Sequence, residues 1–203
     1  DRIKDFLVGL RKFHDIGDYL TINISSPNTE NLRNFHNKTE LEELLESIQN
    51  EKMKLYTKIP IAVKISPNIE NNKIEIIAEI LKKYSVDILI ISNTSDKNRE
   101  NLKNINKLEK GGLSGKPIEL LSNLLINKFY KLIGEKIKII GVGGVDSGQG
   151  AFEKIINGAS LVQLYTGMVY KGPNIASIIS NELIDILKKQ GIENISQAVG
   201  TKN

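Results

Sequence analysis

Five short apolar runs rich in β-branched residues alternate with helical patterns, and this alternation constrains the fold more than any other feature. The apolar runs cover residues 19–24, 61–65, 86–92, 137–142 and 161–165. Helical spacing covers residues 3–13, 38–52, 74–83, 117–132, 149–157 and 173–190. Continuous apolar runs of this length are typical of strands buried on both faces of a parallel sheet. Because the links between runs and helices are short, the sequence predicts a parallel α/β protein.

This pattern alone fits an open doubly wound sheet or part of an eight-stranded barrel. An open sheet usually carries one glycine-rich phosphate loop after its first strand. Here, polar residues or glycines follow all five runs, and a barrel gathers such strand ends around one mouth, where active sites lie. Five strands cannot close a barrel, and unpaired buried edges are unfavourable. We therefore predict that residues 1–203 form the C-terminal portion, about five βα units, of a single larger (β/α)₈ TIM-barrel domain.

The first apolar run ends in an unusually polar segment, residues 23–29, with the sequence Asn-Ile-Ser-Ser-Pro-Asn-Thr. Asn23 and Asn28 can each donate and accept hydrogen bonds, so together they could grip a planar ring that bears carbonyl and N–H groups. Ser26 lies between them and is the side chain that could exchange a proton with such a ring. The structural alternative is a polar connection in which these residues cap the following helix.

Further candidate residues follow the later runs. Lys64 ends an apolar run, where a buried charge needs an anionic or electron-rich partner; alternatively it extends to the rim or pairs with a carboxylate. Residues 143–144 and 165–167 combine glycines with a hydroxyl before helices, which indicates an anion site, and barrels often bind phosphate in such loops. The glycine-rich residues 111–115 form either a flexible loop or a place where a flat cofactor approaches the backbone.

Composition limits the classes of function. The 203 residues are 40% hydrophobic, enough for one substantial core. The net charge of +4 is spread over many lysines, and aromatic residues make up only 5%, so we do not expect nucleic acid binding. The sequence has no cysteine, and its two histidines, His14 and His36, are predicted to be surface or helix-face residues, so we predict no metal site.

No apolar run approaches the roughly 18 residues of a membrane helix, and no signal peptide is visible. The sequence begins at Asp1 within a helical pattern, so we expect a truncated or processed protein.

These segments together resemble the dihydroorotate dehydrogenases. Residues 23–29, followed by Leu32 and Arg33, resemble the signature of the family's fourth strand. Further matching blocks, in the family's order, are residues 63–64, 92–94, 111–117, 141–145 and 158–166. Asn31 stands where the family usually has glycine, at a position that needs positive φ, which asparagine tolerates well. The resemblance implies a barrel with FMN at its mouth that oxidises dihydroorotate to orotate in pyrimidine synthesis.

The resemblance also implies a role for each candidate residue. Ser26 matches the base that takes a proton from C5 of dihydroorotate, with Thr29 a candidate for the proton relay. Lys64 matches the lysine at the N1–O2 edge of the flavin, where a cation stabilises the reduced ring. The residues that match those holding the pyrimidine are Asn23, Asn28, Asn93 and Thr94. The residues that match those lining FMN and its phosphate are Asn23, Ser92, Ser114, Gly115, Gly143, Gly144, Tyr165 and Thr166.

Serine at position 26, in a sequence without cysteine, indicates the quinone-linked class of the family, because the soluble classes have cysteine there. This class implies a quinone acceptor, membrane association through an N-terminal region missing from this chain, and a location at the mitochondrial inner membrane. The richness in Ile, Lys and Asn suggests an AT-rich genome, as in apicomplexan parasites. Two alternatives stay open. One is a phosphate-binding barrel isomerase or aldolase without flavin; the other is a non-catalytic fragment that binds nothing.

Overall fold

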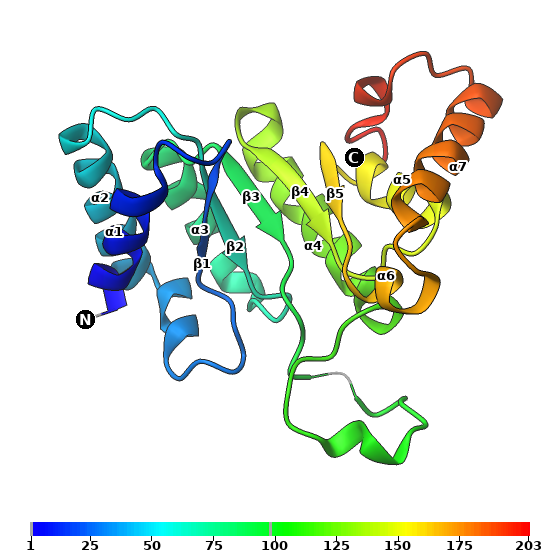
Figure 1. Cartoon of the computed structure of the whole chain (residues 1–203), viewed down its shortest axis with the longest axis horizontal. Helices are drawn as coiled ribbons and strands as arrows, with labels where there is room; N and C mark the ends of the chain where they lie inside the picture. The colour runs from blue at the N-terminus through cyan, green and yellow to red at the C-terminus, as the bar shows by residue number, and fades with distance from the viewer. Residues whose placement is uncertain (1, 98) are drawn as a thin grey trace.

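The computed structural model contains one five-stranded parallel sheet (Figure 1). It describes residues 2–97 and 99–203, so that Asp1 and Asn98 lie outside the described residues. The strands are β1 (Leu20–Asn23), β2 (Ile61–Ile65), β3 (Ile88–Ile91), β4 (Lys138–Val142) and β5 (Leu161–Gln163). They lie in chain order, and each neighbouring pair is parallel. A doubly wound sheet reverses its strand order partway along, so this order supports the predicted barrel-like arrangement.

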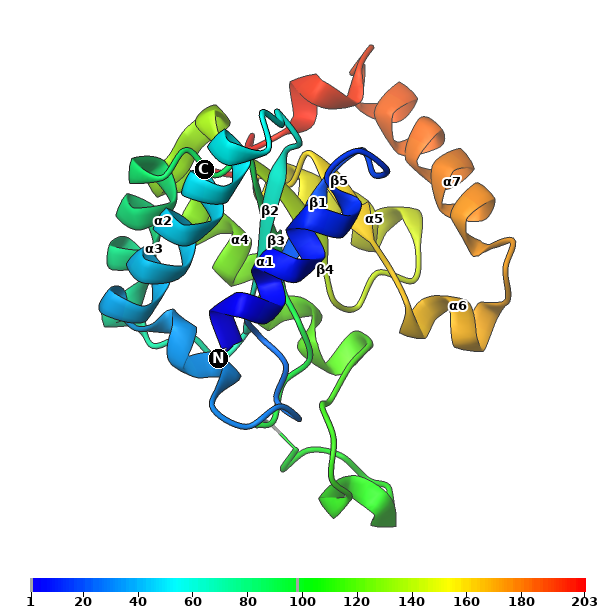
Figure 2. The same ribbon diagram turned by 60° about the vertical axis from the view of Figure 1, so that its left-hand side comes forward.

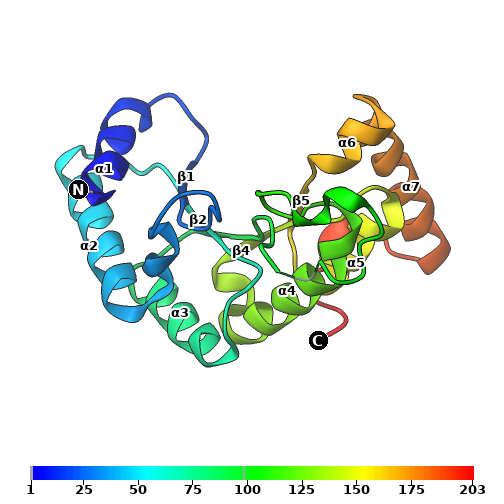
Figure 3. The same cartoon turned by 90° about the horizontal axis from the view of Figure 1, so that it is seen from below.

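The α-helices form an arc around the outside of the strands (Figure 3). Their bounds are α1 (Arg2–Phe13), α2 (Lys38–Lys54), α3 (Asn71–Lys83), α4 (Glu119–Ile133), α5 (Gly148–Ile156), α6 (Thr166–Lys171) and α7 (Ile175–Gln190). The 3₁₀ helices are η1 (Leu32–His36), η2 (Ile105–Leu108), η3 (Lys116–Ile118), η4 (Gly134–Lys136) and η5 (Ile195–Ala198). The sequence pattern does not predict α6, whose six residues are too few for a periodic signal. Among the described residues, no helix combines the length and apolar character needed to cross a membrane.

The two faces of the sheet have different roles because successive strand residues point to opposite sides. On β2, Ile61, Val63 and Ile65 are fully buried in the main core, which the outer helices complete. Ala62 lies on the opposite face and packs with residues of β3 and β4 in a smaller apolar cluster. Lys64 shares the face of Ala62, so strand periodicity directs its side chain away from the helices.

The sheet is strongly curled. β1 and β5 are its two edges, yet the Gln163 Nε2 donates a hydrogen bond to the Tyr19 hydroxyl at 3.2 Å. Four strand spacings of about 4.8 Å would separate the edges of a flat sheet by about 19 Å, farther than these two side chains reach together. The sheet therefore has the curvature of a barrel wall.

The segment between β3 and α4 projects beyond the ends of the strands (Figures 1 and 2). Its base is closed by an antiparallel bridge in which Ser95 and Leu113 exchange backbone hydrogen bonds of 2.9 and 2.6 Å. Within it, Arg99 Nη1 donates to the carbonyl oxygens of Lys107 and Glu109 at 3.0 and 2.7 Å. The backbone bridge and the bonds from the Arg99 side chain to the main chain hold the glycine-rich residues 111–115 close to the end of β3.

The sequence analysis predicted a surface or helix-face residue at His36, and the structure places it in a helix but not at the surface. It is only 6% exposed, in η1. Its Nε2 accepts from the Ser66 N–H at 3.2 Å, and its Nδ1 lies 2.9 Å from the carbonyl oxygen of Arg33. Burial lowers the pKa of His36, and a neutral ring protonated on Nδ1 satisfies both contacts. The histidine thus joins η1 to the end of β2.

Candidate active site

A cavity of about 350 Å³ opens at the carboxyl ends of β2 to β5. The predicted site residues that line it are Lys64, Ser92, Asn93, Thr94, Ser114, Gly115, Gly143, Gly144, Tyr165 and Thr166. Residues predicted from separate parts of the sequence therefore surround one space. Asn23, Ser26 and Asn28, from the end of β1, are not among its lining residues. Asn23 lies beside the cavity, since its Oδ1 is 3.4 Å from Asn93 Nδ2.

Two carboxamides from different strands meet at this edge of the cavity. Ser25 Oγ donates to Asn23 Oδ1 at 2.7 Å, and Asn93 Nδ2 donates to Ser25 Oγ at 3.0 Å. Asn93 Nδ2 also lies 3.4 Å from Asn23 Oδ1. Ser25 is fully buried, so it holds both amides in fixed positions. The sequence analysis gave Ser25 no role, and its signal was only its place in the polar segment 23–29.

Ser26 lies in a tight local turn. Its Oγ accepts from the Asn28 N–H at 3.2 Å and lies 3.2 Å from Thr29 Oγ1. The two hydroxyls considered for a proton relay are therefore in contact. The Asn28 side chain is exposed, and no hydrogen bond joins it to Asn23 in the part of the chain that the structure describes. Asn93, not Asn28, is the amide that meets Asn23.

Lys64 is a half-buried cation at the cavity wall. Among residues 2–97 and 99–203, its side chain forms no hydrogen bond or ion pair, so the alternative of a carboxylate partner finds no support there. Burial lowers its pKa. A partly desolvated ammonium group without a partner favours an anionic or electron-rich ligand.

The loops after β3 and β4 each contain a glycine that no other residue could replace without movement. Gly115 and Gly144 have φ values of 76° and 80°. A Cβ on Gly144 would lie 2.4 Å from the Cβ of Glu119, and one on Gly115 would lie 2.9 Å from Thr166 Cγ2. Thr166 Oγ1, after β5, donates to Ser114 Oγ at 2.8 Å and so joins that strand end to the glycine-rich residues 111–115. Uncovered backbone and hydroxyl groups of this kind suit a phosphate group.

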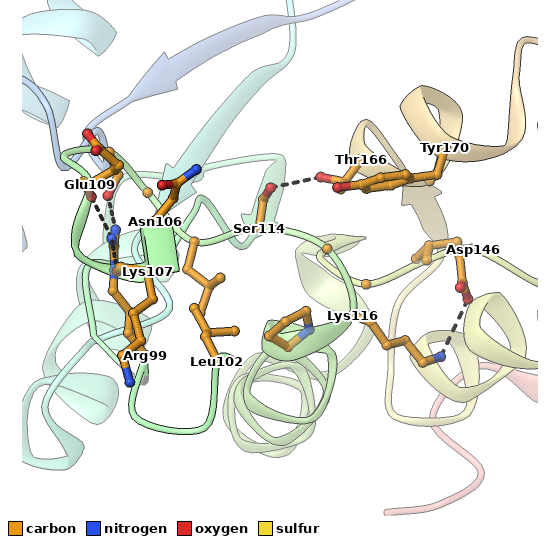
Figure 4. Close-up of a pocket in the computed structure, with 18 of the residues that line it drawn as sticks. Arg99, Leu102, Asn106, Lys107, Glu109, Ser114, Lys116, Asp146, Thr166 and Tyr170 are labelled. Carbon is orange, nitrogen blue, oxygen red and sulfur yellow. Dashed lines mark hydrogen bonds and ion pairs between the residues drawn. The ribbon is translucent and has the colours of Figure 1, made fainter. Parts of the chain in front are cut away.

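A second hollow, of about 530 Å³, adjoins the cavity beyond Ser114 and Thr166 (Figure 4). Lys116, which lines this hollow, already pairs with carboxylates, because its Nζ lies 2.8 Å from Glu119 and 3.4 Å from Asp146. We therefore place the candidate active site in the smaller cavity, where Lys64 has no such partner among the described residues.

A family model for dihydroorotate dehydrogenase matches residues 1–187. The chain belongs to the dihydroorotate dehydrogenase family. Among its curated relatives, the dihydroorotate dehydrogenase (quinone) of Bartonella tribocorum is 42% identical over 200 residues, which covers 96% of this chain and 55% of the relative. The mitochondrial dihydroorotate dehydrogenase (quinone) of Mus musculus is also 42% identical, over 98% of this chain and 51% of the relative. The chain thus spans about half the length of these relatives.

A crystal structure of ligand-free dihydroorotate dehydrogenase from Eimeria tenella superposes on the chain with a TM-score of 0.96 at 32% identity. It covers 100% of this chain, which spans 61% of that structure. These matches confirm the resemblance read from the sequence, and the names of the curated relatives agree with the predicted quinone-linked class. The structure also confirms positive φ at Asn31, which has a φ of 58° at the usual glycine position of the family.

The sequence analysis missed Lys154, a fully buried lysine on α5. Its Nζ donates to Ser122 Oγ at 3.1 Å and to Asn123 Oδ1 at 2.8 Å, both on α4. Ser122 Oγ in turn donates to the carbonyl of Val142, at the end of β4, at 2.6 Å. Burial lowers the pKa of Lys154 to about 8. A lysine in an amphipathic helix is usually exposed, so no local pattern indicated that Lys154 is buried.

Proposed function

We propose that the protein oxidises dihydroorotate to orotate with FMN and passes the electrons to a quinone in pyrimidine synthesis. One observation carries this proposal: the amide pair of Asn23 and Asn93 lies beside the hydroxyl pair of Ser26 and Thr29 and beside Lys64, whose side chain has no hydrogen-bond or ion-pair partner among the described residues. The names of the relatives support the substrate and the quinone. The name of the mouse relative supports a mitochondrial location, which we propose to be the inner membrane.

The groups around the cavity fit FMN. Lys64 would hold the electron-rich N1–O2 edge of the flavin ring, with Ser92 beside it. Ser114, Thr166 and the glycine backbone at Gly115 and Gly144 would hold the phosphate. Residues that would complete the lining are Asn23, Gly143 and Tyr165. FMN, when bound, supplies a hydride acceptor for C6 of the substrate.

The amide groups would hold the dihydropyrimidine and the hydroxyl pair would move its proton. Asn23 and Asn93 would bind the amide edges of the ring, with Asn28 and Thr94 as further contacts. Ser26 would then take the proton from C5. A serine hydroxyl is a weak base, so its own proton must pass to a neighbour as it reacts. Thr29 Oγ1, 3.2 Å away, is the first available group.

Substitution of Ser26 tests this function directly. In the full-length protein, Ser26→Ala should retain FMN and reduce the rate of flavin reduction by dihydroorotate by roughly 100-fold or more, the usual scale of acid–base catalysis. Stopped-flow absorbance of the flavin measures this half-reaction. Ser180→Ala is a matched control. Ser180 is an exposed residue of α7, and its Oγ donates a hydrogen bond to the Ala176 carbonyl of the same helix at 2.9 Å. A near wild-type rate in Ser26→Ala at neutral pH would contradict its role as base, and a colourless wild-type protein would contradict the flavin.

A further inference from the structure

Arg33, in η1, contacts the two loops that carry the proposed base and the proposed substrate amides. Its Nε donates to the carbonyl oxygen of Ser25 at 3.3 Å, and its Nη2 donates to the carbonyl oxygen of Thr94 at 3.5 Å. Its Nη1 pairs with Asp96 Oδ2 at 2.7 Å. One guanidinium group thus connects the segment after β1 with the segment after β3.

The network extends to the loop after β2. Asp96 Oδ1 accepts a hydrogen bond from Asn68 Nδ2, and Asn68 Oδ1 accepts one from Ser95 Oγ at 3.0 Å. The carbonyl of Arg33 is itself held by Nδ1 of the buried His36. Arg33 is therefore fixed at its backbone as well as at its guanidinium group, and three strand-end loops share one set of hydrogen bonds.

Stability alone does not account for this arrangement. The Arg33 and Asp96 side chains are 25% and 45% exposed, and ion pairs of such exposure contribute little to folding. The planar guanidinium group, however, presents its N–H groups in a rigid fork, so partners on different sides of it keep a fixed spacing. A lysine would offer a flexible stem and a single charged centre in its place.

We propose that Arg33 is a positioning residue that sets the spacing between the Ser26 loop and the Asn93–Thr94 loop. Arg33 is not among the residues that line the cavity, so it acts through the backbone of Ser25 and Thr94. This inference rests on the proposed function, because it takes the two loops to hold the base and the substrate of one reaction. With Arg33 in place, the Ser26 hydroxyl is held at the C5 proton of a ring bound by Asn93.

The test compares Arg33→Met with Arg11→Met in the full-length protein. Arg11 also pairs with a carboxylate, that of Glu51 at 2.5 Å, but it joins α1 to α2 away from the cavity. Both variants lose a guanidinium group and an ion pair. We expect unchanged FMN content in both variants. The rate of flavin reduction should fall on the order of 10- to 100-fold in Arg33→Met only, which is the loss in rate expected when reacting groups are misaligned. Orotate should also bind less tightly to Arg33→Met.

Isotope effects separate misalignment from a general structural loss. With dihydroorotate deuterated at C5, the isotope effect on flavin reduction should rise in Arg33→Met, because removal of that proton becomes more strongly rate-limiting. The effect of deuterium at C6 should not rise, since the Ser26 loop does not carry the hydride. A variant that merely contains less folded protein would show wild-type values for both isotope effects.

The outcomes distinguish this inference from the proposed function. A wild-type protein that does not oxidise dihydroorotate contradicts the proposed function. A wild-type protein that does so, together with an Arg33→Met variant of unchanged rate, orotate affinity and isotope effects, overturns the role of Arg33 alone. If Arg33→Met does not fold, Arg33→Lys carries the same test. Arg33→Lys keeps a positive charge near Asp96 but lacks the planar guanidinium group. A wild-type rate and a wild-type C5 isotope effect in Arg33→Lys would therefore also overturn the inference.

Discussion

Lys64 and Asn93 stand at neighbouring strand ends but are held in different ways. Asn93 is engaged at both ends of its carboxamide, since Nδ2 donates to Ser25 Oγ and Oδ1 accepts from the Thr94 N–H at 2.7 Å. Lys64 has no such contacts in the described part of the chain, and burial lowers its pKa. The asparagine is therefore held in place by the chain itself, whereas the partner of the lysine would, in our proposal, be the flavin.

This difference predicts different effects of substitution. Lys64→Ala should weaken FMN retention or make the flavin harder to reduce, because a charge that stabilises the reduced ring is lost. Asn93→Ala should stay yellow and weaken orotate binding by about 1–3 kcal/mol, the cost of an unpaired buried amide. Flavin content, flavin potential and an orotate titration measure these effects, with the exposed Lys58→Ala as a control. A colourless Asn93→Ala and a normal Lys64→Ala would show that the two roles are wrongly assigned.

The places of single residues at strand ends could be predicted from the sequence, but their partners could not. The extent of the apolar run at residues 61–65 was enough to place Lys64 at the end of a strand. The meeting of Asn23 with Asn93, 70 residues later, depends on the register of three strands and on a buried serine between them. The contacts of Arg33 with Thr94 and Asp96 are equally remote in sequence. No local sequence pattern indicates contacts between residues so far apart in the chain.

At the scale of elements, the glycine-rich loop depends on a very close approach to the end of β3. A Cβ on Gly112 would lie 1.8 Å from Thr94 Oγ1 and 3.3 Å from Pro27 Cγ. Glycine at this position therefore allows the loop to contact both proposed substrate loops. Strand and helix positions could be predicted from periodicity, but this loop could not, because its path is fixed by the distant Ser95–Leu113 bridge.

Gly112→Ala should accordingly displace either the loop or Thr94. Overpacking of this kind costs about 1–3 kcal/mol, so we expect orotate affinity to fall by roughly tenfold or more. Gly9→Ala is the control, since nothing lies within 4 Å of a Cβ at that position. An orotate titration of both variants decides the question. Equal affinity in the two would mean that the close approach has no effect on the substrate site.

Lys154 links α5 to α4 and makes stability depend on pH. Burial lowers its pKa from 10.5 to about 8 in the folded chain. Below about pH 8 the lysine is charged in both the folded and unfolded states, and the folded state carries the full cost of the buried charge. Between about pH 8 and 10.5 the folded state loses this proton first, so the cost disappears and stability rises with pH. The pKa difference sets an upper limit of about 3 kcal/mol on this gain.

Lys154→Met should remove this dependence, since an apolar side chain of similar length carries no charge. The difference in unfolding free energy between wild type and Lys154→Met should therefore shift in favour of wild type, by up to about 3 kcal/mol, between about pH 7 and pH 10.5. Other titrating groups are common to both proteins and cancel. Urea unfolding followed by circular dichroism at the two pH values measures the shift. A difference that does not change with pH would mean that Lys154 is not charged at neutral pH or is not buried.

At the scale of the whole molecule, strand order and curvature place the site. Because the strands lie in chain order and the helices form an arc outside them, all five carboxyl ends meet on one side (Figure 3). The alternation of strands and helices predicted a parallel sheet, and the polar residues or glycines after all five runs favoured the strand order of a barrel over that of a doubly wound sheet. The degree of curvature could not be predicted, because it arises from strand twist and from side-chain packing on the inner face, such as that of Ala62, Ile90 and Ile140.

Cross-linking tests this curvature. Tyr19 and Gln163 meet at 3.2 Å although they belong to opposite edges of the sheet, and the 203 residues contain no cysteine that would compete. In a protein with Tyr19→Cys and Gln163→Cys, a bismaleimide shorter than the ~19 Å between the edges of a flat sheet should join the two positions within one molecule. The pair Tyr56→Cys and Gln163→Cys should not be joined, since Tyr56 follows α2 and is 95% exposed. Urea should abolish the preference for the first pair. Equal cross-linking of both pairs, or of neither, would show that the edges do not face each other and that the strand ends do not surround one cavity.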